Sequence, residues 1–298
     1  MRAMTSCDSG KKDRVRRDSS IVTGYFMCKS QISLRKFFKL YLEVLFYGIA
    51  CYAAFVLFGN APFEWEMIID SVLPFKSMTS SFVAAFLVFY SLIPFLNILI
   101  NNLTGRQHLI LAILCLLIFS LTSVFHSYRI DIDYIEWFCI VYIVGAYLRL
   151  HFKQWMENQK MVTFTLSGIV GVAILSIVAF EFFIKGGYNY FLLADCNKPL
   201  AVLVSIFAFL WFRNLKISYS LWINRLASAT FGVLLIHTNS DLMRQWLWTD
   251  ICNVLGVYHS AFYWIIALLQ VLGIFAAASV IDLARQKYFE RPLLKRFF

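Results

Sequence analysis

The sequence predicts an all-α integral membrane protein: a polytopic bundle of about eight transmembrane helices with both termini in the cytoplasm. Of its 298 residues, 60% are hydrophobic and only 15% are charged, and the apolar residues gather in long runs. A soluble domain of this size averages nearer half apolar and a quarter charged residues. The surplus of apolar side chains is too large for one aqueous core and has to face lipid. A soluble protein is therefore excluded.

The apolar runs mark the expected spans. Crossing the hydrocarbon core takes about twenty residues, so the short runs at 135, 200 and 226 become spans only if neighbouring helices bury their flanks. Pro292 is expected to end the last helix. The runs are Phe38–Leu57, Phe82–Ile100, Leu109–Phe125, Ile135–Leu148, Val162–Phe183, Leu200–Phe212, Leu226–Ile236 and Phe262–Val280.

The distribution of charge supports this topology independently. With the N-terminal segment inside and the sides alternating, 22 of the 27 Lys and Arg residues fall on the cytoplasmic side, as the positive-inside rule requires. The net charge of +10 therefore reflects topology, and we expect no nucleic-acid partner. The outer loops carry acidic residues instead: Glu64, Glu66, Asp70, Asp131, Asp133, Asp195, Asp241 and Asp250.

The chain divides into a short tail and one membrane domain. Residues 1–20 are polar and basic, and we expect a disordered, solvated tail. The apolar stretch Ile21–Cys28 is too short for a signal peptide or a span. Residues 21–298 are expected to form a single domain with membrane lipid as its partner. Any chemistry has to occur within the helix bundle or at its mouths, and the oligomeric state stays undetermined.

A basic cluster opens the first complete span. Arg35, Lys36 and Lys39 lie within about one helical turn of each other. Such residues commonly anchor cytoplasmic helix ends by reaching lipid headgroups. Clustered ammonium and guanidinium groups also suit the pyrophosphate of a cytoplasmic, nucleotide-bearing donor. Both interpretations stay open, and these three residues are the candidate cofactor-binding set.

A second polar group follows the short apolar run at 226–236. His237 should lie inside the bundle, where polar groups are costly and usually have a partner or a task. An imidazole suits proton transfer near neutral pH. A buried His bonded to backbone is an equally weighted alternative. Together with Asn239 and Arg244, His237 forms the candidate catalytic set.

Two acidic tripeptides raise a different possibility. Glu64 with Glu66, and Asp131 with Asp133, could hold a divalent metal beside a lipid-linked phosphate. A polyprenyl-phosphate-dependent membrane glycosyltransferase is therefore one alternative function, and a non-catalytic membrane protein is another. The outer loops are acidic in any case, and the seven Cys residues lack paired spacing, so we expect no bound metal.

Six stretches form a recognisable series that runs from residue 21 almost to the C-terminus. They are Gly24–Phe26 with Ser33–Leu40, Tyr90–Leu103, Trp137–Arg149, Ala227–His237 and Glu290–Pro292. Their order and spacing resemble the acyltransferase 3 family of membrane acyltransferases, particularly the branch in bacterial surface-polysaccharide gene clusters.

The resemblance implies a reaction and its substrates. Family members transfer an acyl group, usually acetyl, from cytoplasmic acyl-CoA to a carbohydrate on the far side of the bacterial plasma membrane. They carry a basic RxxR-type pair implicated in binding the CoA donor, and Lys36 and Lys39 occupy those places here. The positive charge is kept, while the fork geometry of Arg is lost.

One part of the family pattern is not matched. Family members begin with two further spans, which carry an Arg and the His considered essential for catalysis. This chain enters the pattern near Gly24, and none of its five His residues (108, 126, 151, 237 and 259) takes that place. The resemblance therefore implies an N-terminally incomplete acyltransferase domain, and the activity of this chain stays open.

Overall fold

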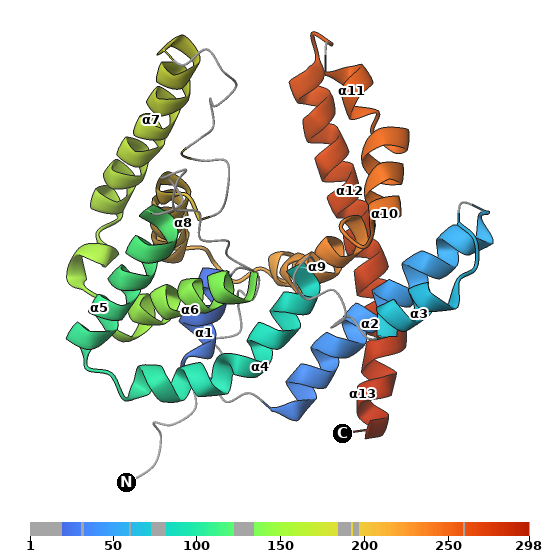
Figure 1. The fold of residues 1–298 in the computed structure, drawn as a ribbon, viewed down its shortest axis with the longest axis horizontal. Helices are drawn as coiled ribbons and strands as arrows, with labels where there is room; N and C mark the ends of the chain where they lie inside the picture. The colour runs from blue at the N-terminus through green and yellow to red at the C-terminus, as the bar shows by residue number, and fades with distance from the viewer. Residues whose placement is uncertain are drawn as a thin grey trace. The chain divides into compact units, whose positions relative to one another are not determined.

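The computed structural model describes residues 20–30, 33–59, 61–72, 82–121, 134–183, 192, 197–258 and 260–297. Every regular element in these ranges is a helix, which confirms the all-α prediction (Figure 1). The expected tail lies almost wholly outside the described residues, since the first helix begins at Ser20.

Four of the described helices are long and apolar enough to cross a membrane, so the chain is a membrane protein. Shorter apolar helices correspond to the runs at 109, 200 and 226. The four long helices are α2 (Leu34–Leu57), α4 (Phe82–Asn101), α7 (Gln159–Phe183) and α12 (Tyr263–Arg285), which continues into α13. The shorter ones are α5 (Gly105–Leu116), α8 (Pro199–Asn214) and α9 (Leu221–His237).

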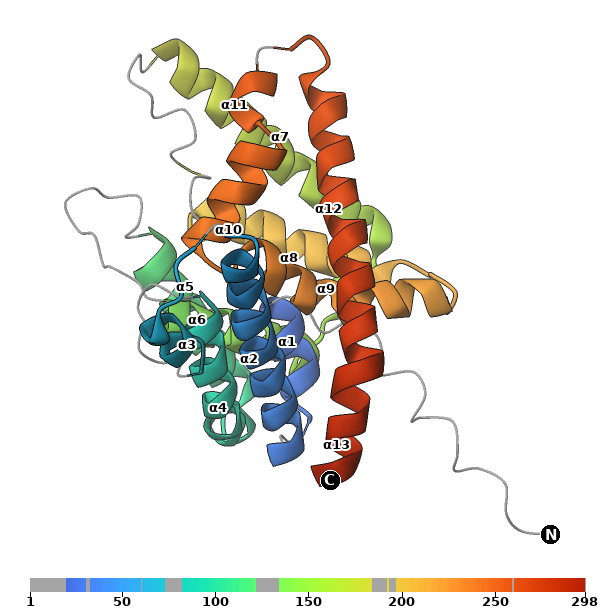
Figure 2. The same ribbon diagram turned by 90° about the vertical axis from the view of Figure 1, so that its right-hand side faces the viewer.

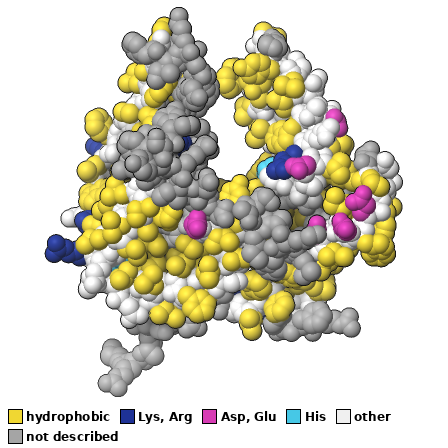
Figure 3. All heavy atoms as spheres, in the orientation of Figure 1, with side chains coloured by type: hydrophobic (Ala, Val, Ile, Leu, Met, Phe, Trp, Pro, Cys, Tyr) yellow, Lys and Arg dark blue, Asp and Glu magenta, His cyan; other side chains and the backbone are white. Residues whose placement is uncertain are grey.

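Two of the long helices, α7 and α12, expose large apolar side chains. On α7, Phe164 is 82% exposed, and on α12, Trp264 is 81% exposed. Figure 3 shows hydrophobic side chains over both helices. An aqueous surface would not tolerate such continuous apolar faces, whereas hydrocarbon solvates them.

Local capping sets where several helices begin. The Ser33 hydroxyl accepts a hydrogen bond from the Lys36 backbone N–H at 3.4 Å and starts α2. Thr104 and Gln107 form a reciprocal capping box at α5. Ser220 caps α9 in the same way, so this helix begins five residues before its apolar run. The short run at 226–236 thereby becomes a helix of 17 residues.

The end of the last long helix corrects one expectation. Pro292 does not end it, because α12 passes through a π-helical turn, η6 (Gln286–Glu290), into α13 (Arg291–Phe297). Pro292 is the second residue of α13, directly after the π-helical turn. Figure 2 shows α12 and α13 as one continuous rod.

The described helices belong to two compact units. The first unit comes from residues between 32 and 87 and between 220 and 298. In it, α2 packs on α9, and α9 packs on α12. Its core contains Tyr47 and Phe55 of α2 with Leu235 of α9. The smaller helices of this unit are α3 (Trp65–Val72), α10 (Asp241–Gln245), η5 (Trp246–Ile251) and α11 (Val254–Val257).

The second unit comes from residues between 19 and 31 and between 88 and 219. Its most buried element is α6 (Tyr134–Leu150), against which α1 (Ser20–Met27) packs closely. Gly24 and Gly145 make this approach possible: a Cβ on Gly24 would overlap the Tyr142 carbonyl oxygen, and one on Gly145 would overlap the Ile21 carbonyl oxygen. The remaining short elements of this unit are η2 (Leu117–Leu121) and η4 (Gln154–Glu157).

The glycine contact predicts a specific sensitivity. Gly24→Ala should lower the free energy of unfolding by about 1–3 kcal/mol, because the added methyl group has to push α1 away from α6. Gly168→Ala on α7 is the matched control, since a Cβ there meets nothing within 4 Å. The midpoint of thermal unfolding in detergent measures both effects. Equal shifts for the two variants would contradict the close backbone approach.

Candidate functional site

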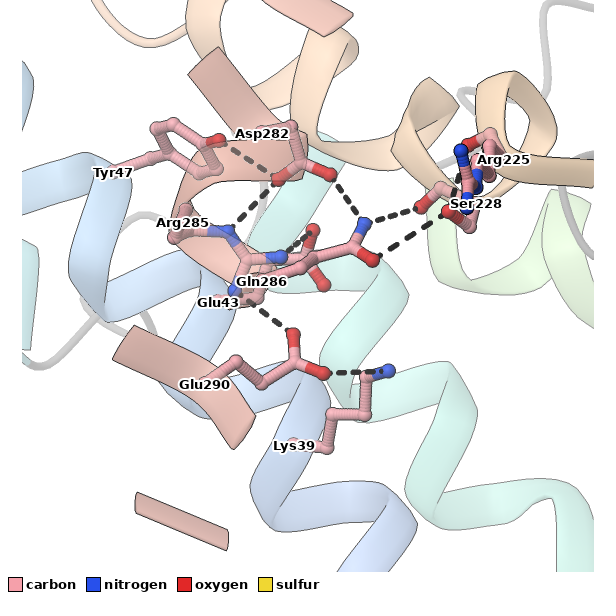
Figure 4. Close-up of polar contacts among 9 residues, drawn as sticks. All are labelled: Lys39, Glu43, Tyr47, Arg225, Ser228, Asp282, Arg285, Gln286 and Glu290. Carbon is pink, nitrogen blue, oxygen red and sulfur yellow. Dashed lines mark hydrogen bonds and ion pairs between the residues drawn. The ribbon is translucent and has the colours of Figure 1, made fainter. Parts of the chain in front are cut away.

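Ionisable side chains gather inside the first unit, where α2 faces α12 and η6 (Figure 4). Lys39, Glu43 and Tyr47 are spaced by four residues and therefore share one face of α2. We call the set that they form with α12 and η6 the charge network. Its other members are Asp282, Arg285, Gln286 and Glu290.

Arg285 is the centre of the charge network. Its Nε lies 2.8 Å from Asp282 Oδ1, its Nη1 3.0 Å from Glu290 Oε2, and its Nη2 2.8 Å from Glu43 Oε1. The pair of Nη2 and Glu43 is an ion pair without hydrogen-bond alignment. The Arg285 side chain is only 2% exposed. One planar fork thus holds three carboxylates that come from two spans and the π-helical turn.

Four further contacts complete the network. The Tyr47 hydroxyl donates a hydrogen bond of 2.8 Å to Asp282 Oδ1. Lys39 Nζ lies 2.7 Å from Glu290 Oε1, at the more exposed end. Gln286 Nε2 donates to Asp282 Oδ2 at 2.7 Å and to the Ser228 carbonyl of α9 at 3.1 Å. The network therefore links α2, α9 and α12 (Figure 4).

Two local features make this geometry possible. The π-helical turn η6 brings residues five apart onto one face, and Arg285 and Glu290 are separated by five. Gly232 on α9 leaves room for Asp282, because a Cβ at this glycine would overlap the carboxylate. Both features are unusual within a helix, and both serve the same group of side chains.

The charges do not balance within the network. Three carboxylates face two cations when all five groups are ionised. Charged groups inside membrane spans are expensive and generally face a bundle interior, where they mark functional sites. Arg285 satisfies three of them at once, so its removal would leave buried charges without compensation.

The three candidate donor-binding residues differ in their contacts: Lys39 belongs to the charge network, whereas Arg35 and Lys36 lie outside it. Lys39 joins the charge network through Glu290, and its side chain is 42% exposed. Arg35 and Lys36 lie in the first turn of α2, and the Arg35 side chain is exposed. Their role in binding a donor stays a prediction. The structure adds that Lys39 is held in place by a carboxylate of the Glu290–Pro292 stretch.

The candidate catalytic residues lie in the same unit. His237 ends α9, and its Nδ1 lies 2.7 Å from the Val233 carbonyl oxygen. A carbonyl can only accept, so Nδ1 carries the proton, and Nε2 of the neutral ring keeps its lone pair. The alternative of a backbone-bonded His therefore holds for Nδ1, whereas Nε2 has no hydrogen-bond partner among the described residues.

Asn239 and Arg244 differ in their surroundings. Asn239 Nδ2 donates to the Tyr47 carbonyl at 3.2 Å, which ties the segment after α9 to the network helix α2. Arg244 pairs with the neighbouring carboxylate of Asp241 on the exposed side of α10. Within the described residues, no hydrogen bond or ion pair joins Arg244 to His237 or Asn239. The structure thus brings Asn239 to the network and leaves Arg244 apart from it.

The acidic tripeptides form no metal site in the part of the chain that the structure describes. Glu64 and Glu66 are exposed, and no group of three or more potential metal ligands occurs among the described residues. Asp131 and Asp133 lie outside those residues.

Loss of Arg285 should be far more damaging than loss of a nearby surface charge. Arg285→Gln is expected to lower the free energy of unfolding by about 3–5 kcal/mol, because it leaves buried carboxylates unpaired. Lys287→Gln is the control, since Lys287 lies two residues away and is exposed. Thermal unfolding in detergent compares the two. Similar midpoints for both variants would show that the network does not stabilise the unit.

Comparison with known proteins gives the family. A family model described as an acyltransferase domain matches residues 20–282, most of the chain. No curated protein and no solved structure matches this chain. The matched range includes Lys39, Glu43, His237 and Asp282, whereas Glu290 lies beyond its end. The chain belongs to the acyltransferase 3 family of membrane acyltransferases.

Proposed function

We propose that this protein transfers an acyl group, acetyl in the simplest case, from cytoplasmic acyl-CoA to a carbohydrate hydroxyl on the opposite side of a bacterial plasma membrane. The family match over residues 20–282 is the observation that carries this proposal. A buried charge network inside two membrane-spanning helices supports it, because such groups are retained where they serve a function.

The proposed topology has eight spans and both termini in the cytoplasm. Four long helices and several shorter apolar ones supply the spans. The distribution of basic residues among the loops supports this orientation, since 22 of the 27 Lys and Arg residues fall on the side taken as cytoplasmic. In this orientation, α2 begins in the cytoplasm, and α9 runs from the cytoplasm outward.

The donor is proposed to bind at the cytoplasmic start of α2. Arg35, Lys36 and Lys39 place positive charge there, and phosphates of CoA are suitable anionic partners. The ion pair between Lys39 and Glu290 supports this role by fixing the position of α2 relative to η6. No metal is required by the proposed reaction.

The candidate catalytic residues are proposed to meet the donor inside the membrane. Asn239 donates a hydrogen bond to the carbonyl of Tyr47. Tyr47 lies eight residues after Lys39 on α2, a distance of about 12 Å along a helix. This is less than half of a hydrocarbon core of about 30 Å. This bond supports a site that a donor bound at the cytoplasmic start of α2 can reach, since it ties the segment after His237 to the same helix.

The proposed chemistry is a single acyl transfer. The acceptor hydroxyl oxygen attacks the thioester carbonyl carbon, a C–O bond forms, and the C–S bond breaks. His237 Nε2 takes the hydroxyl proton as general base and returns it to the departing thiolate. The bond between His237 Nδ1 and the Val233 carbonyl supports this role, because it fixes the tautomer that leaves Nε2 basic. Asn239 and Arg244 complete the proposed site.

Transfer across the membrane is directly testable. Inside-out membrane vesicles from bacteria that express the full chain would receive radiolabelled acetyl-CoA on their outer, cytoplasmic face. We expect hydroxylamine-labile label to accumulate on carbohydrate within the vesicles. Vesicles without the protein are the control. Equal labelling in both preparations would contradict the proposed function.

The same assay tests the role of His237. His237→Ala should reduce transfer about a hundredfold or more, because general base catalysis contributes on that scale. Trp248→Phe is the control, since it keeps an aromatic ring beside His237, where the two ring centres lie 6.5 Å apart. Full activity of His237→Ala would remove His237 from the site but leave the family assignment intact.

A further inference from the structure

Two guanidinium groups converge on one phenol in the second unit. Arg149 lies in the last turn of α6, Arg213 in the last turn of α8, and Tyr25 on α1. Arg149 Nη1 donates to Tyr25 Oη at 3.1 Å, and Arg213 Nε donates to the same oxygen at 2.8 Å. The two donor nitrogens therefore lie within about 6 Å of each other, at a separation where like charges repel.

Aromatic packing holds these groups in place. Tyr25 is 4% exposed and packs edge-on against Phe209, with 5.1 Å between the ring centres. The guanidinium carbon of Arg213 lies 3.7 Å from the centre of the Phe152 ring. Stacking of this kind leaves the N–H groups at the edge of the guanidinium free to bond in its plane.

Two hydrogen-bond donors of this cluster, the Tyr25 hydroxyl and Arg213 Nη2, have no acceptor among the described residues. Tyr25 Oη already accepts two bonds, and its own hydrogen donates to no described residue. Arg213 bonds only to neutral groups in the described part of the chain, namely Tyr25 Oη and Asn214 Oδ1. Its Nη2 has no hydrogen-bond partner among the described residues. The Tyr25 hydroxyl hydrogen and Arg213 Nη2 are thus two donors beside the positive charge of Arg213, and an anion is the group that would accept from both.

The ends of helices explain only part of this arrangement. A single Arg in the last turn of a helix interacts favourably with the helix dipole and can reach outward to headgroups. Here both side chains instead turn onto one buried hydroxyl, and their donor nitrogens lie close together.

We propose that Tyr25, Arg149 and Arg213 form a binding site for a phosphate-class anion. Guanidinium forks match the spacing of phosphate oxygens, and the Tyr25 hydroxyl adds a third donor. The alternation of charge along the chain puts both Arg residues at the cytoplasmic ends of their helices. Phosphate is available there from anionic lipid headgroups and, if the proposed function holds, from the phosphates of acyl-CoA.

Binding of inorganic pyrophosphate to the full chain in detergent tests the site without any acyl transfer. Arg149→Gln and Arg213→Gln should each raise the dissociation constant about tenfold or more, since each removes a charge-assisted hydrogen bond. Lys216→Gln is the control, because this exposed lysine lies three residues beyond Arg213. Tyr25→Phe keeps the packed ring and should weaken binding less. A wild-type protein that does not bind pyrophosphate, or equal binding by all variants, would overturn the proposal.

Two further arms distinguish the sources of phosphate. If the natural ligand is a lipid, nanodiscs that contain phosphatidylglycerol should block pyrophosphate binding, whereas phosphatidylcholine discs should not. If it is the donor, CoA should compete with pyrophosphate in phosphatidylcholine discs, and Arg213→Gln should weaken CoA binding. Competition by neither ligand would overturn the proposal. Anion binding without acyl transfer in vesicles would contradict the proposed function alone.

Discussion

The first unit depends on the burial of Arg285 among carboxylates inside a membrane-spanning helix. A lone guanidinium at this depth would be strongly unfavourable, so Glu43, Asp282 and Glu290 have to be close by. The π-helical turn η6 and the glycine at 232 are the local adjustments that allow it. The network adds polar links between α2, α9 and α12 to the apolar core that Tyr47, Phe55 and Leu235 form.

This constraint also positions the residues proposed to act on substrate. Lys39 is fixed through Glu290, and Tyr47 connects the network to Asn239 through its backbone carbonyl. The proposed donor end and the segment with His237 are thus attached to the same helix, α2. A rigid connection of this kind keeps catalytic groups in register with each other, as acyl transfer requires.

The fold class and the helices could be predicted from the sequence, because hydrophobicity and length are local properties. The expected run Phe82–Ile100 corresponds to the helix Phe82–Asn101, and the short run at 226–236 lies within α9, which begins after its cap Ser220.

The centre of the charge network could not be foreseen. Arg285 looks like one more cytoplasmic charge, and its partner Glu43 lies on a distant part of the chain. The spacing of Lys39, Glu43 and Tyr47 was the available signal, because these polar residues share a face of an apolar helix. Arg149 and Arg213 were likewise counted as topology charges, and only tertiary packing brings them to Tyr25.

A double-mutant cycle on Glu43 and Arg285 tests the central role of this ion pair most directly. The free energy of unfolding would be measured for Glu43→Gln, Arg285→Met and the double variant in detergent. We expect a coupling energy above about 2 kcal/mol, because each partner is costly to bury without the other. Losses that add to within about 0.5 kcal/mol would contradict the pair as the interaction that holds α2 to α12.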